Sequence, residues 1–203
     1  MTMGIFQVHP RRALLKELAA ASIVGLLPGL SNLALARTPL TVTPECEDGE
    51  ELTPSQTEGP YFTPNSPQRT VLRESDMTGT PILLTGFVLS RSCVPLAGVL
   101  VELWHADDAG VYDNEGYRLR GHQFTGADGS YRFATIVPGL YPGRTRHFHA
   151  KFQAPDQPIL TTQFYFPNEA DNSQDRIFNP DLLLKIADGP ERIARFDVVL
   201  AIA

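Results

Sequence analysis

Six short runs of β-branched and aromatic residues constrain the fold more than any other feature of this sequence. They are ILLTGFVLS, GVLVELWHA, YRFATIV, HFHAKFQA, LTTQFYF and RFDVVLAI. Turn signals separate them, including ADGS at 127–130 and VPGLYPG at 137–143. Short strands joined by tight turns are typical of an antiparallel sandwich or barrel. We therefore predict an all-β chain, an antiparallel β-sandwich over residues 81–203, in which DLLLKI at 181–186 forms a helical turn or a strand.

The first 36 residues indicate an export signal. Arg11 and Arg12 precede an apolar stretch over 18–30, and the segment ends in the small-x-small pattern of residues 34–36. The stretch is shorter than the roughly 20 apolar residues that a spanning helix needs. It resembles a twin-arginine signal, so we expect cleavage after residue 36 and export to the periplasm or beyond, with no membrane attachment afterwards. The alternative is an amphipathic N-terminal helix.

Residues 37–80 form the second predicted segment. The part up to residue 67 is rich in Pro, Thr, Ser and Glu, which indicates an extended arm rather than a helix. Exported chains with two cysteines often pair them, and a Cys46–Cys93 bridge would tie the arm to the core. Two separate buried thiols are the alternative. We expect arm and sandwich to form a single domain, because the whole chain has 203 residues.

The charge of the chain excludes one broad class of partner. The formal net charge is −6, whereas a nucleic-acid-binding surface needs a basic face. We therefore expect no nucleic-acid partner.

The segment YPGRTRHFH at 141–149 carries the strongest chemical signal. On a strand, His147 and His149 project to the same face and Phe148 to the other. Such a pair is half of a metal site, or alternatively two hydrogen-bonding histidines. Tyr141 stands just upstream in a Pro-Gly turn that could fold it back over the imidazoles. A phenolate is a hard anionic ligand that favours ferric iron over zinc or ferrous iron.

The sequence resembles the intradiol ring-cleavage dioxygenases, from TEGPYF at 57–62 to TTQFYFP at 161–167. The shared segments are PLAGVLVELWHADDAGVYD, GADGSYRFATIVPGLYPGRTRHFH and TTQFYF. The resemblance implies a loop-borne Fe(3+) site with Tyr112, Tyr141, His147 and His149 as ligands. Tyr112 is identified only through the resemblance. It further implies cleavage of a catechol between its hydroxyl-bearing carbons with O2, giving a cis,cis-muconate-type product, and family precedent favours a homo-oligomer.

Two more residues match pocket positions of the family, Arg144 and Gln163. The resemblance implies that Arg144 stabilises negative charge on the ring and that Tyr141 is the ligand that dissociates. Without the resemblance, Arg144 would be a loop arginine in a surface ion pair and Gln163 an ordinary strand glutamine. Arg146 alternates away from the proposed ligands, which predicts a surface position.

Other readings of the chain stay open at this stage. The chain could be an exported binding module with a vestigial metal site, or a zinc or copper enzyme that uses the two histidines with a carboxylate. We expect His105 to have a structural role, His122 to lie in a loop and Tyr61 to serve packing. The acidic residues Asp107, Asp108 and Asp113 are expected to be turn residues near Tyr112.

Overall fold

The computed structural model describes residues 51–203. The described residues lie within one compact unit. The predicted signal boundary at residue 36 and Cys46 of the predicted Cys46–Cys93 pair lie outside the described residues, so both stay predictions. Within the described residues, no helix has the length and apolarity to cross a membrane.

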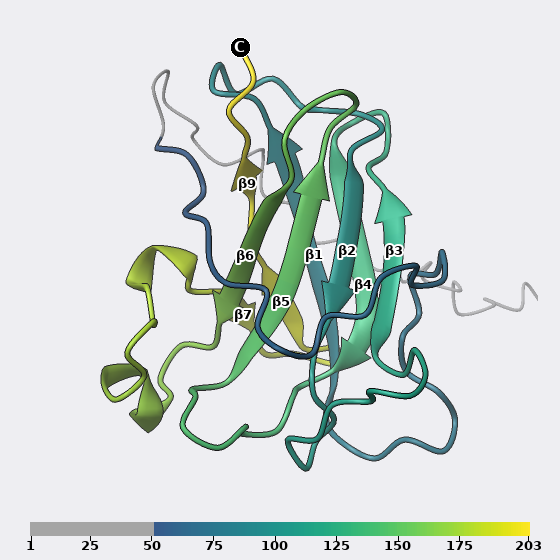
Figure 1. Ribbon diagram of the computed structural model, residues 1–203, viewed down its shortest axis with the longest axis vertical. Coiled ribbons are helices and arrows are strands. Elements are labelled where there is room, and N and C mark those ends of the chain that lie inside the picture. The colour runs from purple at the N-terminus through teal and green to yellow at the C-terminus, as the bar shows by residue number, and fades with distance from the viewer. Residues whose placement is uncertain (1–50) are drawn as a thin grey trace, which may run out of the picture. The chain divides into compact units, whose positions relative to one another are not determined.

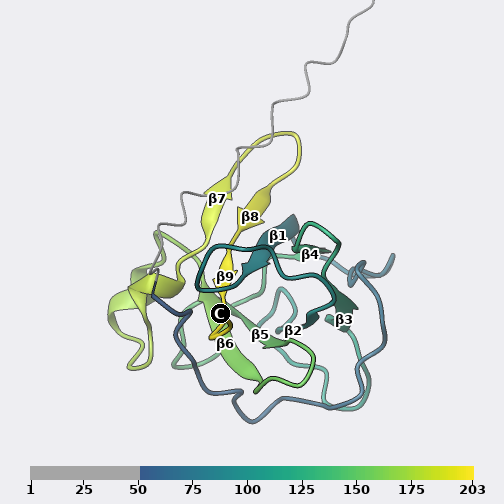
Figure 2. The same cartoon turned by 90° about the horizontal axis from the view of Figure 1, so that it is seen from above.

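Two facing sheets form the framework of the described chain (Figures 1 and 2). The first has the order β4 (Ser130–Ile136), β1 (Pro81–Leu89), β8 (Ile193–Arg195) and β7 (Lys185–Ala187), and β9 (Val198–Val199) also pairs with β1. The second has the order β3 (Arg120–Phe124), β2 (Leu100–Trp104), β5 (His147–Gln153) and β6 (Leu160–Tyr165). This β-sandwich confirms the predicted fold class. Strand β1 pairs in parallel with β8 and β9, and the other pairings between named strands are antiparallel.

Alternate residues of β5 separate the core of the sandwich from its outer face. Phe148 and Phe152 point inward and are fully buried against residues of the first sheet such as Phe133. Burying one such ring stabilises the fold by about 1.5–3 kcal/mol. His147 and His149 point to the opposite face, and yet both are buried. Something other than the second sheet must therefore cover that face.

The arm provides this cover. Between Gln56 and Arg69 it crosses the outer face of the second sheet, passing in front of β6, β5 and β2 towards β3 (Figure 1). Residues 70–72 then pair with Ala134 of β4 in the first sheet. Backbone hydrogen bonds hold it at both ends: Gln56 N–H donates to the Thr161 carbonyl at 2.8 Å, and Arg69 N–H to the His122 carbonyl at 3.0 Å. The predicted extended arm is thus a strap over one face of the sheet.

Two local expectations were wrong. His122 was expected in a loop but lies on β3, whose sequence RGHQF has no apolar alternation. Pairing with β2 and a contact of His122 Nδ1 with the Ser66 carbonyl at 2.8 Å stabilise this strand instead.

The segment DLLLKI is neither one helical turn nor one strand. A 3-10 helix, η2 (Pro180–Leu182), begins where Asn179 caps Pro180-Asp181, and β7 follows. A further 3-10 helix, η1 (Ala170–Ser173), precedes them.

Candidate metal centre

The two imidazoles at the start of β5 face each other with their Nε2 atoms 3.1 Å apart. His147 Nδ1 lies 2.6 Å from the Thr145 carbonyl oxygen. A carbonyl only accepts, so Nδ1 carries the proton and the neutral ring keeps its lone pair on Nε2, aimed at His149. Burial lowers the pKa of His147 to about 4. The ring is therefore neutral at physiological pH.

His149 is held by packing. Its ring stacks on Trp104 with a centroid distance of 5.0 Å and an interplanar angle of 9°. Gly59 of the arm covers it at φ +70°, and a Cβ there would lie 3.3 Å from His149 Cε1. His149 Nδ1 is buried and has no hydrogen-bond partner among the described residues. Burial, and then the neighbouring His147, lowers the pKa of this ring well below its usual value.

Tyr112 completes one side of the histidine pair. It follows β2 in a loop, is buried, and places its hydroxyl oxygen 3.4 Å from His147 Nε2. Burial raises the pKa of this phenol, against the opposing effect of Arg144 and Arg120. A cation next to the oxygen would be needed to hold it as phenolate at neutral pH.

Tyr141 lies next to Tyr112, with ring centroids 6.0 Å apart and an interplanar angle of 82°. It begins a tight turn in which Arg144 N–H donates to the Tyr141 carbonyl at 3.0 Å and Gly143 has φ +78°. Gly143 tolerates this left-handed conformation because it has no Cβ. The turn places Tyr141 and Arg144 at its two ends, so both come to the same site.

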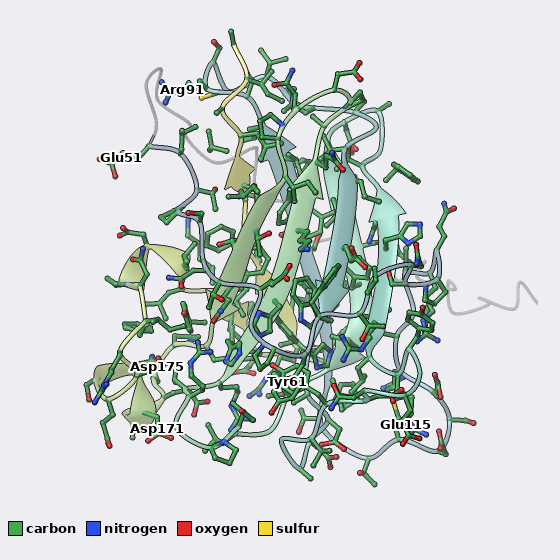
Figure 3. All side chains as sticks on the ribbon, in the orientation of Figure 1. Glu51, Tyr61, Arg91, Glu115, Asp171 and Asp175 are labelled. Carbon is green, nitrogen blue, oxygen red and sulfur yellow. The ribbon has the colours of Figure 1, made fainter. Side chains whose placement is uncertain are left out.

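A third tyrosine, which sequence reasoning assigned to packing, joins this pair. Tyr61 from the arm stacks on Tyr112 at 4.6 Å, and its hydroxyl lies 2.9 Å from that of Tyr141. Figure 3 labels Tyr61 at the lower ends of β2 and β5. Arg120 Nη1 donates to the Tyr61 carbonyl at 2.6 Å and fixes the arm there. The motif TEGPYF was visible in the sequence, but its contact with Tyr141 depends on where the arm crosses the sheet.

Arg144 is held in a buried polar network. Its Nε donates to Asp175 Oδ2 at 2.8 Å and its Nη2 to Gln163 Oε1 at 2.6 Å. Gln163, on β6 and fully buried, donates from Nε2 to the Thr57 carbonyl of the arm at 2.8 Å. Arg144 is thus not in a surface ion pair, and Gln163 is not an ordinary strand residue.

Asp175 was not a candidate from the sequence, because it lies 31 positions from Arg144 in an unremarkable segment. Burial alone would raise its pKa, but hydrogen bonds from Ile177 N–H, the Arg144 guanidinium and Thr145 N–H hold that pKa below the usual value. A cleft of about 400 Å³ opens beside this network. Its lining comprises residues 140–144, Asp171, Gln174 and Asp175; Figure 3 labels both aspartates.

The donor set fits a ferric ion. Two neutral imidazoles direct their Nε2 atoms at each other, and a buried phenol oxygen lies beside them. Within residues 51–203, no group of three or more His, Cys, Asp or Glu side chains could hold a metal. The oxygen donor next to the histidines is the Tyr112 phenol, and phenolate is the harder ligand type that suits trivalent iron.

The remaining polar candidates take structural positions. His105 lies on the core side, with its Nε2 2.6 Å from Thr135 Oγ1. Arg146 is half-buried rather than on the surface, and its Nε donates to Glu169 at 2.7 Å. Asp107 and Asp113 accept backbone N–H groups within their own loops, as expected of turn residues.

Several known proteins are similar to this chain in sequence and structure. A family model described as Dioxygenase matches residues 57–200. The dioxygenase domain of a dioxygenase carbohydrate-binding protein fusion from Streptomyces sp. SirexAA-E is 55% identical, with a TM-score of 0.73; the alignment covers 75% of this chain and 100% of that domain.

Two curated relatives extend the comparison. Hydroxyquinol 1,2-dioxygenase of Nocardioides simplex is 28% identical over 70% of this chain and 62% of its own length. The protocatechuate 3,4-dioxygenase beta chain of Burkholderia cepacia is 32% identical over 54% of each. The chain thus spans little more than half the length of these relatives.

Proposed function

The chain belongs to the intradiol ring-cleavage dioxygenase family, and we propose that it is a ferric enzyme which cleaves a catechol between its two hydroxyl-bearing carbons with O2. The product would be a cis,cis-muconate-type diacid. One observation carries the proposal: Tyr112 Oη and the Nε2 atoms of His147 and His149 converge in a buried site.

We assign the iron to Tyr112, Tyr141, His147 and His149. When bound, ferric iron would draw electron density from a chelated catecholate and make the ring reactive towards O2. The burial of the four proposed ligands suits a site in which three ligands stay fixed and one can move. Tyr112 and the histidines are buried, whereas Tyr141 is half-buried at the start of a tight turn. Tyr141 Oη would accept one catechol proton and swing aside, while the other three ligands hold their positions.

Arg144 acts on the substrate in this proposal. Its guanidinium would stabilise negative charge on the ring as oxygen attacks, which is electrostatic preorganisation. Asp175 and Gln163 each accept a hydrogen bond from Arg144, and these two bonds fix the plane of the guanidinium group. Gln163 is itself fixed by the arm, so the arm contributes to the orientation of Arg144.

Oxygen uptake tests the proposal. Purified protein should consume O2 on addition of catechol, with a matching rise in muconate absorbance. The His147→Ala variant should lose this activity, whereas His122→Ala, which removes an imidazole from β3, should keep it. Catechol binding without oxygen uptake in the iron-loaded protein would support a binding module and overturn the enzyme.

We further propose that residues 1–36 direct export by the twin-arginine route. Arg11 and Arg12, the apolar stretch and the small-x-small pattern support this. A reporter fused after residue 36 should leave the cytoplasm, and an Arg11→Lys, Arg12→Lys double variant should retain it there. Export of the double variant at the wild-type rate would argue against that route.

A further inference from the structure

The loops that carry Tyr112 and Tyr141 cross in direct backbone contact. A Cβ added at Gly139 would lie 2.4 Å from Gly110 N, and a Cβ at Gly110 would lie 2.1 Å from the Leu140 carbonyl oxygen. Contacts that close are possible only for glycine. The crossing lies two residues before each tyrosine, so the separation of the loops determines the separation of the phenols.

Asp107 connects the two loops. Its side-chain Oδ1 accepts the N–H groups of Ala109 and Val111 at 3.0 and 2.9 Å, which closes the loop leading to Tyr112. Its carbonyl oxygen accepts Gly139 N–H from the other loop at 2.6 Å. One residue therefore shapes the first loop with its side chain and attaches the second loop with its backbone.

We propose that Asp107 is a positioning residue that sets the spacing between Tyr112 and Tyr141, an inference that rests on the proposed function of these tyrosines as ligands. Asp107 is half-buried, and its side-chain hydrogen bonds go to backbone amides of its own loop. Loss of its side-chain oxygen acceptor frees the Ala109 and Val111 amides and lets the 107–111 backbone relax. The Gly139 attachment then weakens, and the phenol oxygens move apart.

Three variants test this. Asp107→Ala removes the acceptor, Asp107→Asn keeps an oxygen at the same place without the charge, and Asp108→Ala removes an exposed carboxylate from the neighbouring position. Hydrogen exchange of the Val111 and Gly139 amides reports the loop contact with or without iron. The phenolate-to-iron absorption band and the iron content per chain report the ligands.

We expect Asp107→Ala to speed exchange at both amides on the order of tenfold and to shift or weaken the band with partial loss of iron. Asp107→Asn and Asp108→Ala should match wild type in all three measurements. Unchanged exchange and an unchanged band in Asp107→Ala would overturn the proposal. So would an Asp107→Asn variant with altered exchange, which keeps the test decisive if Asp107→Ala does not fold.

Failure of the proposed function has a different signature. Wild-type protein that binds no iron would defeat the ligand assignment whatever the variants show. The exchange rates of the Val111 and Gly139 amides would still decide whether Asp107 joins the loops.

Discussion

His105 and the pair His147–His149 are all buried, but their ring nitrogens differ in their hydrogen-bond partners. His105 has a partner on each nitrogen, the Ala106 carbonyl at 2.7 Å and the Thr135 hydroxyl at 2.6 Å. In the pair, the two Nε2 atoms face each other, and His149 Nδ1 has no partner among the described residues. Trp104 and His105 are adjacent on the chain, yet Trp104 stacks on His149 and His105 points into the core, against Phe148.

The difference separates the two candidate ligand histidines from a structural one. His147 carries its proton on Nδ1, so its Nε2 must accept from His149 or bind a cation, and leaving it unpaired in a buried site would cost about 1–3 kcal/mol. Under the proposed function, a cation shared by the two Nε2 atoms would take that place. His105 needs no such group, because Thr135 and the backbone satisfy it.

The largest expected effect comes from removing one member of the pair. His147→Ala should abolish iron retention, because two imidazoles and a phenol no longer meet, while His105→Gln should keep its iron. Iron per chain, measured after purification without added metal, decides between them. The comparison fails if both variants retain iron equally, since the two kinds of buried histidine would then be equivalent.

Arg144→Leu should separate holding the metal from using it. We expect turnover to fall on the order of a hundredfold to a thousandfold, the usual effect of losing one preorganised donor, with iron content and colour retained. Arg176→Leu removes an exposed cation from the residue next to Asp175 and serves as the matched control. Steady-state oxygen uptake measures both. Turnover near wild type in Arg144→Leu would remove its proposed role.

The pH dependence of stability should identify His105. Burial lowers its pKa to about 4, against 6.5 when unfolded. The unfolded chain therefore binds the extra proton first as pH falls, and stability present above pH 6.5 is lost towards pH 4. Between pH 7 and pH 5 this site should account for about 2 kcal/mol.

Urea unfolding of wild type and His105→Gln at both pH values isolates this contribution, because the other titrating groups are common to the two proteins. Parallel pH profiles would show that His105 is not the buried neutral ring described above.

The smallest effect concerns the arm that keeps the outer face dry. Lys151 Nζ lies 2.7 Å from Glu58 and 3.4 Å from the Phe62 ring centroid, so it pins the arm to β5. Lys151→Met should lower the free energy of unfolding by about 1 kcal/mol and speed iron release. Lys185→Met, at an exposed position of β7, should do neither. Equal effects of the two substitutions would mean that the contact contributes nothing.

The sequence predicted the parts of the molecule that depend on local pattern. The short runs of β-branched and aromatic residues predicted the sandwich, and the spacing of His147 and His149 predicted that both point to the same face. Strand β3 was missed because Arg120, Gly121 and Gln123 carry no apolar alternation and the strand depends on pairing with β2.

The candidate site likewise includes residues that no local sequence pattern identifies. Tyr112 needed the family resemblance, since nothing local distinguishes it from the other tyrosines. Tyr61 and Asp175 reach the site only through the course of the arm and of the segment after β6, which no local spacing encodes.

Metal analysis and the visible spectrum of the purified wild-type protein test the central claim most directly. The account predicts roughly stoichiometric ferric iron and a red colour from phenolate-to-iron charge transfer, which Tyr112→Phe should weaken or abolish. A colourless protein that holds zinc, or that takes up no iron when ferric or ferrous salt is supplied, would contradict it.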